Sequence, residues 1–155
     1  MLTDHGRFSY SGIAKRKSFE WPGGKHIALY IALNIEHFPY GEGGGIDLDR
    51  ETKPWSQRSW LWREYGNRVG GWRLADLFDE LEMNLGVIVN ASNYSHTPEL
   101  LERFRKRGDE MIGHGISNGT ARPIDMSVEE ETNMVADVTK IMTKADGRRP
   151  NGWLS

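Results

Sequence analysis

The feature that most constrains the fold is a run of nine largely apolar residues, 27–35, rich in β-branched and aromatic side chains. A turn signal, Pro22-Gly23-Gly24, comes shortly before it. A continuous run of this kind is typical of a strand buried on both faces, as in a parallel sheet. Shorter runs at 87–89 and 111–112 predict two more strands, and a fourth is predicted to begin within 152–154.

Segments of helical period separate these strands. They are expected over 63–84, from Thr97 to Gly108, and from the capping box of Ser127 to Gly147. The first helix is expected to bury one face, formed by Val69, Trp72, Leu77, Leu81 and Leu85. Strands that alternate with helices predict the α/β class, with parallel strands and right-handed crossovers.

Two segments lie outside this alternation. Residues 1–24 are expected to form an extended arm ahead of a β/α domain over 25–155. Residues 37–62 are expected to form a long loop that contains Trp55, Trp60 and Trp62. Loops of this length are usually functional or disordered, and three tryptophans argue against disorder. The tryptophans either pin the loop or bind substrate, and packing is the more frequent use.

Composition excludes several classes of function. The 155 residues suit one ordinary domain, and the 37% hydrophobic content can bury a core. The formal net charge of −2 offers no basic excess for nucleic acid. No apolar run is long enough for a membrane span, and the first residues lack a signal peptide, so a cytoplasmic location is expected. With no cysteine, disulfides, thiolate metal sites and cysteine nucleophiles are excluded.

The candidate site lies where the predicted strands end, because sites of parallel α/β folds assemble at that edge. The side chains expected there are those of Glu36, His37, Asn90, Asn93, His114, Asn118 and Trp153. Carboxylates, imidazoles and amides suit proton transfer and metal ligation. Taken alone, His37 could equally be a loop residue with a satisfied hydrogen bond, and Asn118 a turn former.

Five stretches of sequence together resemble the polysaccharide deacetylase (NodB-homology) superfamily, most of all its branch of cofactor-free allantoinases and peptidoglycan-deacetylase-like proteins. They occur in the expected order over nearly the whole chain: Trp21-Pro22-Gly23-Gly24-Lys25, Asn34-Ile35-Glu36-His37, the segment from Trp62 to Gly70, the segment from Arg107 to Gly115, and the segment from Gly147 to Leu154. The resemblance implies the N-terminal part of a distorted seven-stranded β/α barrel.

The resemblance also implies roles for individual residues. Glu36 takes the position of the catalytic base, and Arg149 that of the arginine that steadies the base. His37, His114 and Asn118 take the three metal-binding positions. Because an asparagine replaces one imidazole and the metal-binding carboxylate is missing, a divalent metal such as zinc is compatible with this set but not required by it. Trp62, Asn93 and Trp153 are expected to contact substrate.

The leading hypothesis is therefore a hydrolase that acts on carbon–nitrogen bonds other than peptide bonds, with a small amide or an N-acetyl sugar as substrate. The motifs of the second half of the family's barrel are missing, so the chain is expected to be truncated at its C-terminus. The rival hypotheses are a non-catalytic binding or assembly module and an inactive fragment of a longer deacetylase-like protein. Uncovered strand edges of a half barrel would favour a homo-oligomer.

Overall fold

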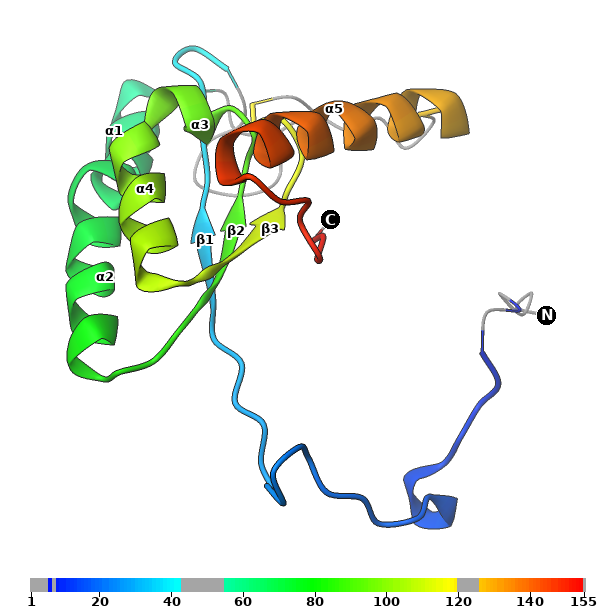
Figure 1. The fold of residues 1–155 in the computed structure, drawn as a ribbon. Coiled ribbons are helices and arrows are strands. Elements are labelled where there is room, and N and C mark those ends of the chain that lie inside the picture. The colour runs from blue at the N-terminus through cyan, green and yellow to red at the C-terminus, as the bar shows by residue number, and fades with distance from the viewer. Residues whose placement is uncertain (1–5, 7, 43–54, 120–125, 155) are drawn as a thin grey trace.

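A computed structural model of the chain describes residues 6, 8–42, 55–119 and 126–154 (Figure 1). Strands β1 (Ala32–Ile35), β2 (Gly86–Val89) and β3 (Glu110–Gly113) form one parallel sheet in that order. Helices connect and follow the strands: α1 (Gln57–Tyr65), a π-helical segment (Gly66–Gly70), α2 (Gly71–Glu80), α3 (Asn93–His96), α4 (Pro98–Arg107) and α5 (Val128–Asp146). This alternation confirms the predicted parallel α/β class.

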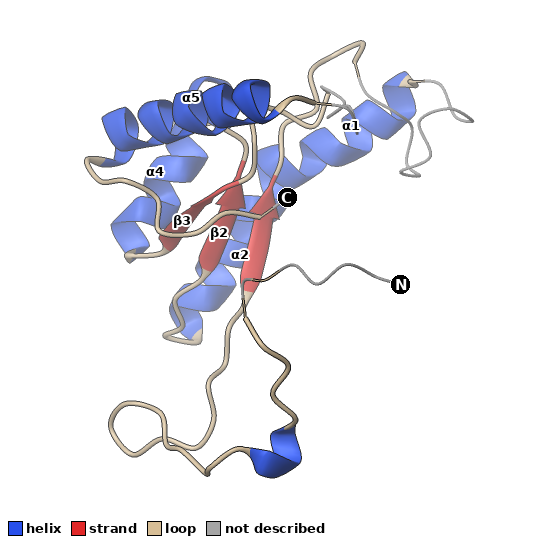
Figure 2. Ribbon diagram, turned by 90° about the vertical axis from the view of Figure 1, so that its right-hand side faces the viewer, coloured by secondary structure: helices blue, strands red, loops and turns tan. Residues whose placement is uncertain are grey.

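The core lies between the sheet and the helices beside it. Helices α2 and α4 lie side by side on one face of the sheet, as Figures 1 and 2 show from two directions. They approach closely at Gly71, where a Cβ atom would lie 2.9 Å from a methyl carbon of Leu100. The central strand β2 is buried along its whole length. It packs with side chains from α4 and α5, among them Leu101, Phe104, Val138 and Met142.

The first strand is shorter than its apolar run predicts. Only the last four residues of the run join the sheet, and Ile27, Leu29 and Tyr30 are 84%, 72% and 64% exposed. The partner strand β2 begins at Gly86, which pairs with Ala32. The Gly86 amide also donates to the backbone oxygen of Ile31, but the residues before Ile31 pass the end of β2, and no strand among the described residues pairs with them. The expectation of a strand buried on both faces over 27–35 is wrong.

The first helical region also differs from its prediction. It begins at Gln57, six residues early, because Ser56 caps it by accepting a hydrogen bond from the Ser59 amide. The predicted apolar face is wrong as well: Trp72, Leu77 and Leu81 are exposed, whereas Gly71 and Ala75 face the core. The π-helical segment explains the error, since its wider turn breaks the 3.6-residue period on which the prediction relied.

The remaining boundaries follow the sequence signals. The capping box forms at Ser127 and Glu130, and Gly108 and Gly147 end their helices in the left-handed conformation. Thr97 holds the N-cap position of α4, but its hydroxyl donates to Asn93 instead of capping the helix. The predicted fourth strand is reduced to one parallel bridge between Trp153 and Gly113 of β3. Within the described ranges, no helix has the length and apolar character needed to cross a bilayer.

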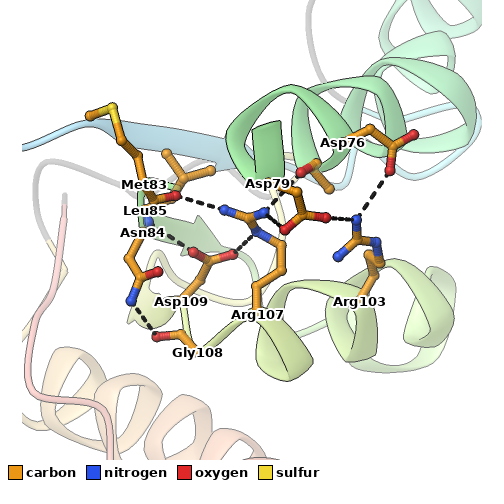
Figure 3. A network of polar contacts seen from close by, with 10 residues as sticks. Asp76, Asp79, Met83, Asn84, Leu85, Arg103, Arg107, Gly108 and Asp109 are labelled. Atoms are coloured by element: carbon orange, nitrogen blue, oxygen red, sulfur yellow. Dashed lines mark hydrogen bonds and ion pairs between the residues drawn. The ribbon is translucent and has the colours of Figure 1, made fainter. Parts of the chain in front are cut away.

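A buried arginine, Arg107, links the elements at the end of the sheet where the strands begin (Figure 3). The Arg107 side chain is 4% exposed and pairs with Asp109 at 2.8 Å and with Asp79 of α2. It also donates to the backbone oxygens of Ala75 and Met83. Asp109 in turn accepts from the amide of Leu85, just before β2. One charged network therefore joins α2, α4 and the entries to β2 and β3.

Candidate active site at the carboxyl edge of the sheet

The three strands end in register, with Ile35 beside Val89 and Val89 beside Gly113. The next residue of each chain segment is therefore brought to one edge: Glu36, Asn90 and His114. All three carry polar side chains, and hydrogen bonds join them into one cluster. The sheet thus gathers the site that the strand-end rule predicts.

Glu36 and His114 form the reactive pair of this cluster. Oε1 of Glu36 lies 3.3 Å from Nε2 of His114 and also accepts from the side-chain amide of Asn34 at 3.3 Å. The hydrogen bond with His114, helped by one from Asn118, holds the pKa of the Glu36 carboxyl below its usual value although partial burial opposes this. Glu36 is therefore ionised at neutral pH and able to act as a base.

The other ring nitrogen of His114 fixes how protons are distributed in the pair. Nδ1 lies 2.9 Å from the backbone oxygen of Leu154, which can only accept, so Nδ1 carries a proton. Nε2 then carries a second proton only in the imidazolium form. A hydrogen bond between Nε2 and Glu36 therefore requires one shared proton, which resides on either the imidazole or the carboxyl group.

Asn90 connects the chain segments that follow the three strands. It is fully buried, and its amide nitrogen donates to the backbone oxygen of His114 at 2.6 Å and to Oδ1 of Asn118 at 3.0 Å. Its own Oδ1 accepts from the amide of His37 at 2.9 Å. A second link runs from the amide of Asn118 to the backbone oxygen of His37, at 2.8 Å. The segments after all three strands are thus held together.

A cleft of about 310 Å³ opens beside Glu36. Its walls come from β1 and from the π-helical segment and its neighbours, and include Leu33, Asn34, Phe38, Trp62, Arg63 and Asn67. Asn67, which is buried in the π-helical segment, donates to the backbone oxygen of Glu36 at 2.8 Å. The Trp62 ring is 64% exposed at this cleft, so it is available to a ligand.

The other two tryptophans of the predicted loop pin it. Trp60 donates to the backbone oxygen of Phe38, and its ring packs edge-on against Tyr40. The Trp55 ring contacts the same tyrosine. Packing is therefore the role of Trp55 and Trp60, and Trp62 alone of the three keeps the expected place at the cleft. The part of this predicted loop between 43 and 54 lies outside the described residues.

His37 belongs to a neighbouring cluster rather than to the Glu36 pair. Its Nδ1 lies 2.8 Å from the hydroxyl of Ser92, and its ring stacks on that of His96 with 4.1 Å between centroids. His96 pairs with the buried carboxylate of Glu64 at 2.9 Å. Burial, together with the neighbouring His96, lowers the pKa of His37. His37 is therefore neutral at neutral pH.

The expected metal set does not fit this arrangement. His37 faces Ser92 and His96, both ring nitrogens of His114 face oxygen atoms, and Oδ1 of Asn118 accepts from Asn90. No group of three or more histidine, cysteine, aspartate or glutamate side chains that could hold a metal occurs in the described part of the chain. His114 and Asn118 both hydrogen-bond Glu36, whereas His37 lies against Ser92 and His96, so no step of the chemistry is assigned to a metal.

Three further residues expected at the site are Arg149, Asn93 and Trp153. Arg149 is exposed and lines a small depression with Glu110 and Met111, at the edge where β3 begins, and its expected role in orienting Glu36 stays a prediction. Asn93 is fully buried, where it donates to the backbone oxygen of Ile35 at 2.7 Å. It braces the end of β1 instead of facing a substrate.

Trp153 supports the site from behind. Its ring packs so closely over Gly113 that a Cβ atom there would lie 2.6 Å from a ring carbon. The bridge between Trp153 and Gly113 also places the next residue, Leu154, where its oxygen meets His114. Trp153 therefore helps to place the Leu154 oxygen at His114, and its expected contact with substrate stays a prediction.

The strand-end rule selected Asn90 along with Glu36 and His114, but it did not predict the part of Asn90 in joining the three segments. Sequence analysis missed Asn67, Glu64 and His96 as members of these clusters. No local signal marked these three, because their places depend on the π-helical turn and on the packing of helices against β1.

Comparison with solved structures identifies the same fold. The crystal structure titled Puue Allantoinase is similar over 99% of this chain, with a TM-score of 0.77 and 24% sequence identity. A probable polysaccharide deacetylase from Pseudomonas aeruginosa PAO1 is similar over 81% of this chain, with a TM-score of 0.65 and 24% identity. The matches cover 54% and 45% of those chains, so this chain spans about half their length. No family model matches the sequence, and no curated protein matches it.

The similarity to these two structures is a similarity of fold, and it confirms the fold that the sequence motifs implied. The chain has the N-terminal part of the β/α barrel fold of the allantoinase and the deacetylase.

Proposed function

We propose that this chain is a hydrolase-type domain that cleaves carbon–nitrogen bonds other than peptide bonds, in a cyclic amide or an N-acetyl group. The observation that carries the proposal is the Glu36–His114 pair at the carboxyl edge of the sheet, of which Glu36 also lines the cleft. The fold supports it, since the proteins that share this fold are described as an allantoinase and a polysaccharide deacetylase.

In the proposed reaction, Glu36 removes a proton from a water molecule, whose oxygen attacks the amide carbon. The Nε2–H of the His114 imidazolium donates to the oxygen of that carbonyl as negative charge develops on it. The carbon–nitrogen bond then breaks, and the proton held by Glu36 passes to the leaving nitrogen. The products are a carboxylic acid, which releases its proton to become a carboxylate, and an amine or amide, so one water molecule accounts for all atoms and charges.

The pair has the right properties for these two roles. The lowered pKa of Glu36 keeps it ionised, and the bond from Nδ1 to the Leu154 oxygen orients the imidazole so that Nε2 faces the site. Trp62, exposed at the cleft, provides a flat apolar surface on which a sugar or heterocyclic ring can lie.

The test is an assay of the full-length protein with three substrates: allantoin, an N-acetylglucosamine oligomer and a dipeptide. Ring opening of allantoin or release of acetate, with the dipeptide intact, is the expected result. Absence of turnover on both amide classes would instead favour a non-catalytic binding module.

A further inference from the structure

We propose that residues 8–31 form a docking arm that binds the outer face of α2 on a second copy of this chain. The arm leaves the body at the start of β1, where Tyr30 and Ile31 still contact Gly86, and most of it extends away from the sheet and helices, as Figures 1 and 2 show in two views. None of its residues is buried. The inference concerns assembly, and it goes beyond the proposed hydrolysis.

The arm is unusually rich in exposed apolar side chains. Eight large ones occur within 24 residues: Phe8, Tyr10, Ile13, Phe19, Trp21, Ile27, Leu29 and Tyr30. An aromatic side chain buries about 150–250 Å² when it is covered. Five aromatic residues therefore approach the roughly 800 Å² per partner of a standard interface. Leaving such a surface in water is unfavourable, and it is typical of an interaction site.

The arm also has local structure of its own. The rings of Phe19 and Trp21 meet edge-on with 5.5 Å between centroids, and Trp21 forms an antiparallel bridge with Lys25. The guanidinium of Arg16 donates to the backbone oxygen of Ser11 at 2.6 Å. A segment that is already shaped loses less conformational entropy when it binds.

Charge identifies the partner as another copy of the same chain. Five basic and two acidic residues give residues 1–31 a net charge of +3. Since the whole chain carries −2, the remaining residues carry −5. Opposite charge favours contact between the arm of one copy and the body of another, whereas two arms repel each other.

The outer face of α2 is the part of the body that matches the arm. It exposes Leu77 and Leu81, two of the residues that the sequence pattern assigned to the core. The acidic residues Glu80 and Glu82 are exposed at the end of the same helix. An apolar and acidic strip of this kind complements a basic arm rich in aromatic side chains. Reciprocal docking of two arms would give a closed dimer with two-fold symmetry.

The experiment compares four proteins by sedimentation velocity over a range of concentrations. They are the wild type, an arm variant (Phe19→Ser with Trp21→Ser), an α2 variant (Leu77→Ser with Leu81→Ser) and a control, Val128→Ser, which removes an exposed apolar side chain from α5. We expect a dimer for the wild type and the control, and dimerisation weakened at least about tenfold in both the arm and the α2 variants. Raised salt should weaken the wild-type dimer too.

All five substituted side chains are exposed, so each variant should keep the fold, and a circular dichroism melt of each checks this. The proposal is overturned by a wild type that stays monomeric at every concentration. It is also overturned by an arm variant or an α2 variant that dimerises as the wild type does, and by arm-dependent binding to anionic lipid vesicles in a protein that remains monomeric.

Discussion

Nε2 of His114 lies 3.3 Å from Oε1 of Glu36, although 78 residues separate the two in the chain. The parallel register of β1, β2 and β3 produces this contact, since Glu36 and His114 each follow the last residue of an outer strand directly. Both ring nitrogens of His114 face oxygen atoms, so His114 and Glu36 share one proton in the hydrogen bond between Nε2 and Oε1. This relationship is the basis of the proposed hydrolysis.

Replacement of Asn90 by alanine should loosen the site and destabilise the fold. The change removes the acceptor of the His37 amide and both donors to the His114 segment, in a fully buried place. Each buried polar group left unpaired costs about 1–3 kcal/mol. Urea unfolding measures the effect. Asn84→Ala, which removes an exposed amide, is the control and should change stability by less than about 0.5 kcal/mol. Equal stability of the two variants would contradict the role of Asn90.

Replacement of Gly113 by alanine should displace Trp153. A Cβ atom at Gly113 would lie 2.6 Å from the Trp153 ring, so the ring must move and take the Leu154 oxygen away from His114. Overpacking of this kind costs about 1–3 kcal/mol. The thermal midpoint and the tryptophan emission spectrum report the change.

The matched control is Gly86→Ala in the central strand. There the added Cβ would meet the ring of Tyr30, which is exposed and free to swing into solvent. We expect a smaller loss of stability for this variant, and an equal or larger loss would contradict the tight packing of Trp153.

The lowered pKa of His37 predicts how stability depends on pH. Because the unfolded chain binds a proton at this histidine more readily than the folded chain does, stability rises with pH over the affected range. On acidification the loss begins near the ordinary histidine pKa of about 6.5 and continues down to the lowered pKa of folded His37. Denaturant unfolding at several pH values measures it.

A phenylalanine at position 37 removes this titration and keeps a ring against His96. The His37→Phe variant should therefore lose less stability than the wild type between pH 7 and pH 5. His26→Phe, in the exposed arm, should follow the wild type. Parallel pH curves for the wild type and the His37→Phe variant would contradict the assigned burial of His37.

Replacement of Arg107 by methionine should strongly destabilise the fold. The change leaves the carboxylate of Asp109, which is 2% exposed, without its cation. Breaking a buried ion pair in this way costs about 3–5 kcal/mol. Lys106→Met is the control, since that side chain is 73% exposed on the same helix, and its unfolding midpoint should hardly move. A midpoint for the Arg107→Met variant close to that of the wild type would be the contrary result.

The sequence predicts the order of strands and helices well, because local signals carry that information. Turn residues, capping residues and β-branched runs mark β2, β3, α4 and α5 almost to the residue. Two predictions failed where the outcome depends on distant parts of the chain. The length of β1 is set by where β2 begins, and the buried face of α2 is set by the π-helical turn before it.

The same distinction applies to the site. Glu36 and His114 could be predicted, because each follows a strand and parallel strands end at one edge. The neighbours of Arg149 could not be predicted, because they follow from the path between α5 and Trp153, which no local pattern fixes. The contact of His37 with Ser92 and His96, in place of His114, likewise depends on where α3 lies.

The most direct test of the account is the rate of amide hydrolysis by the Glu36→Gln variant of the full-length protein. Glutamine keeps the size of the side chain but cannot take a proton from water. Loss of general base catalysis typically lowers the rate by about 10²–10⁴-fold. Glu42→Gln, an exposed neighbour outside the Glu36–His114 pair, is the control. We expect this loss of kcat for Glu36→Gln, with an unchanged melting temperature and a control that matches the wild type. Wild-type turnover by the folded Glu36→Gln variant would contradict it.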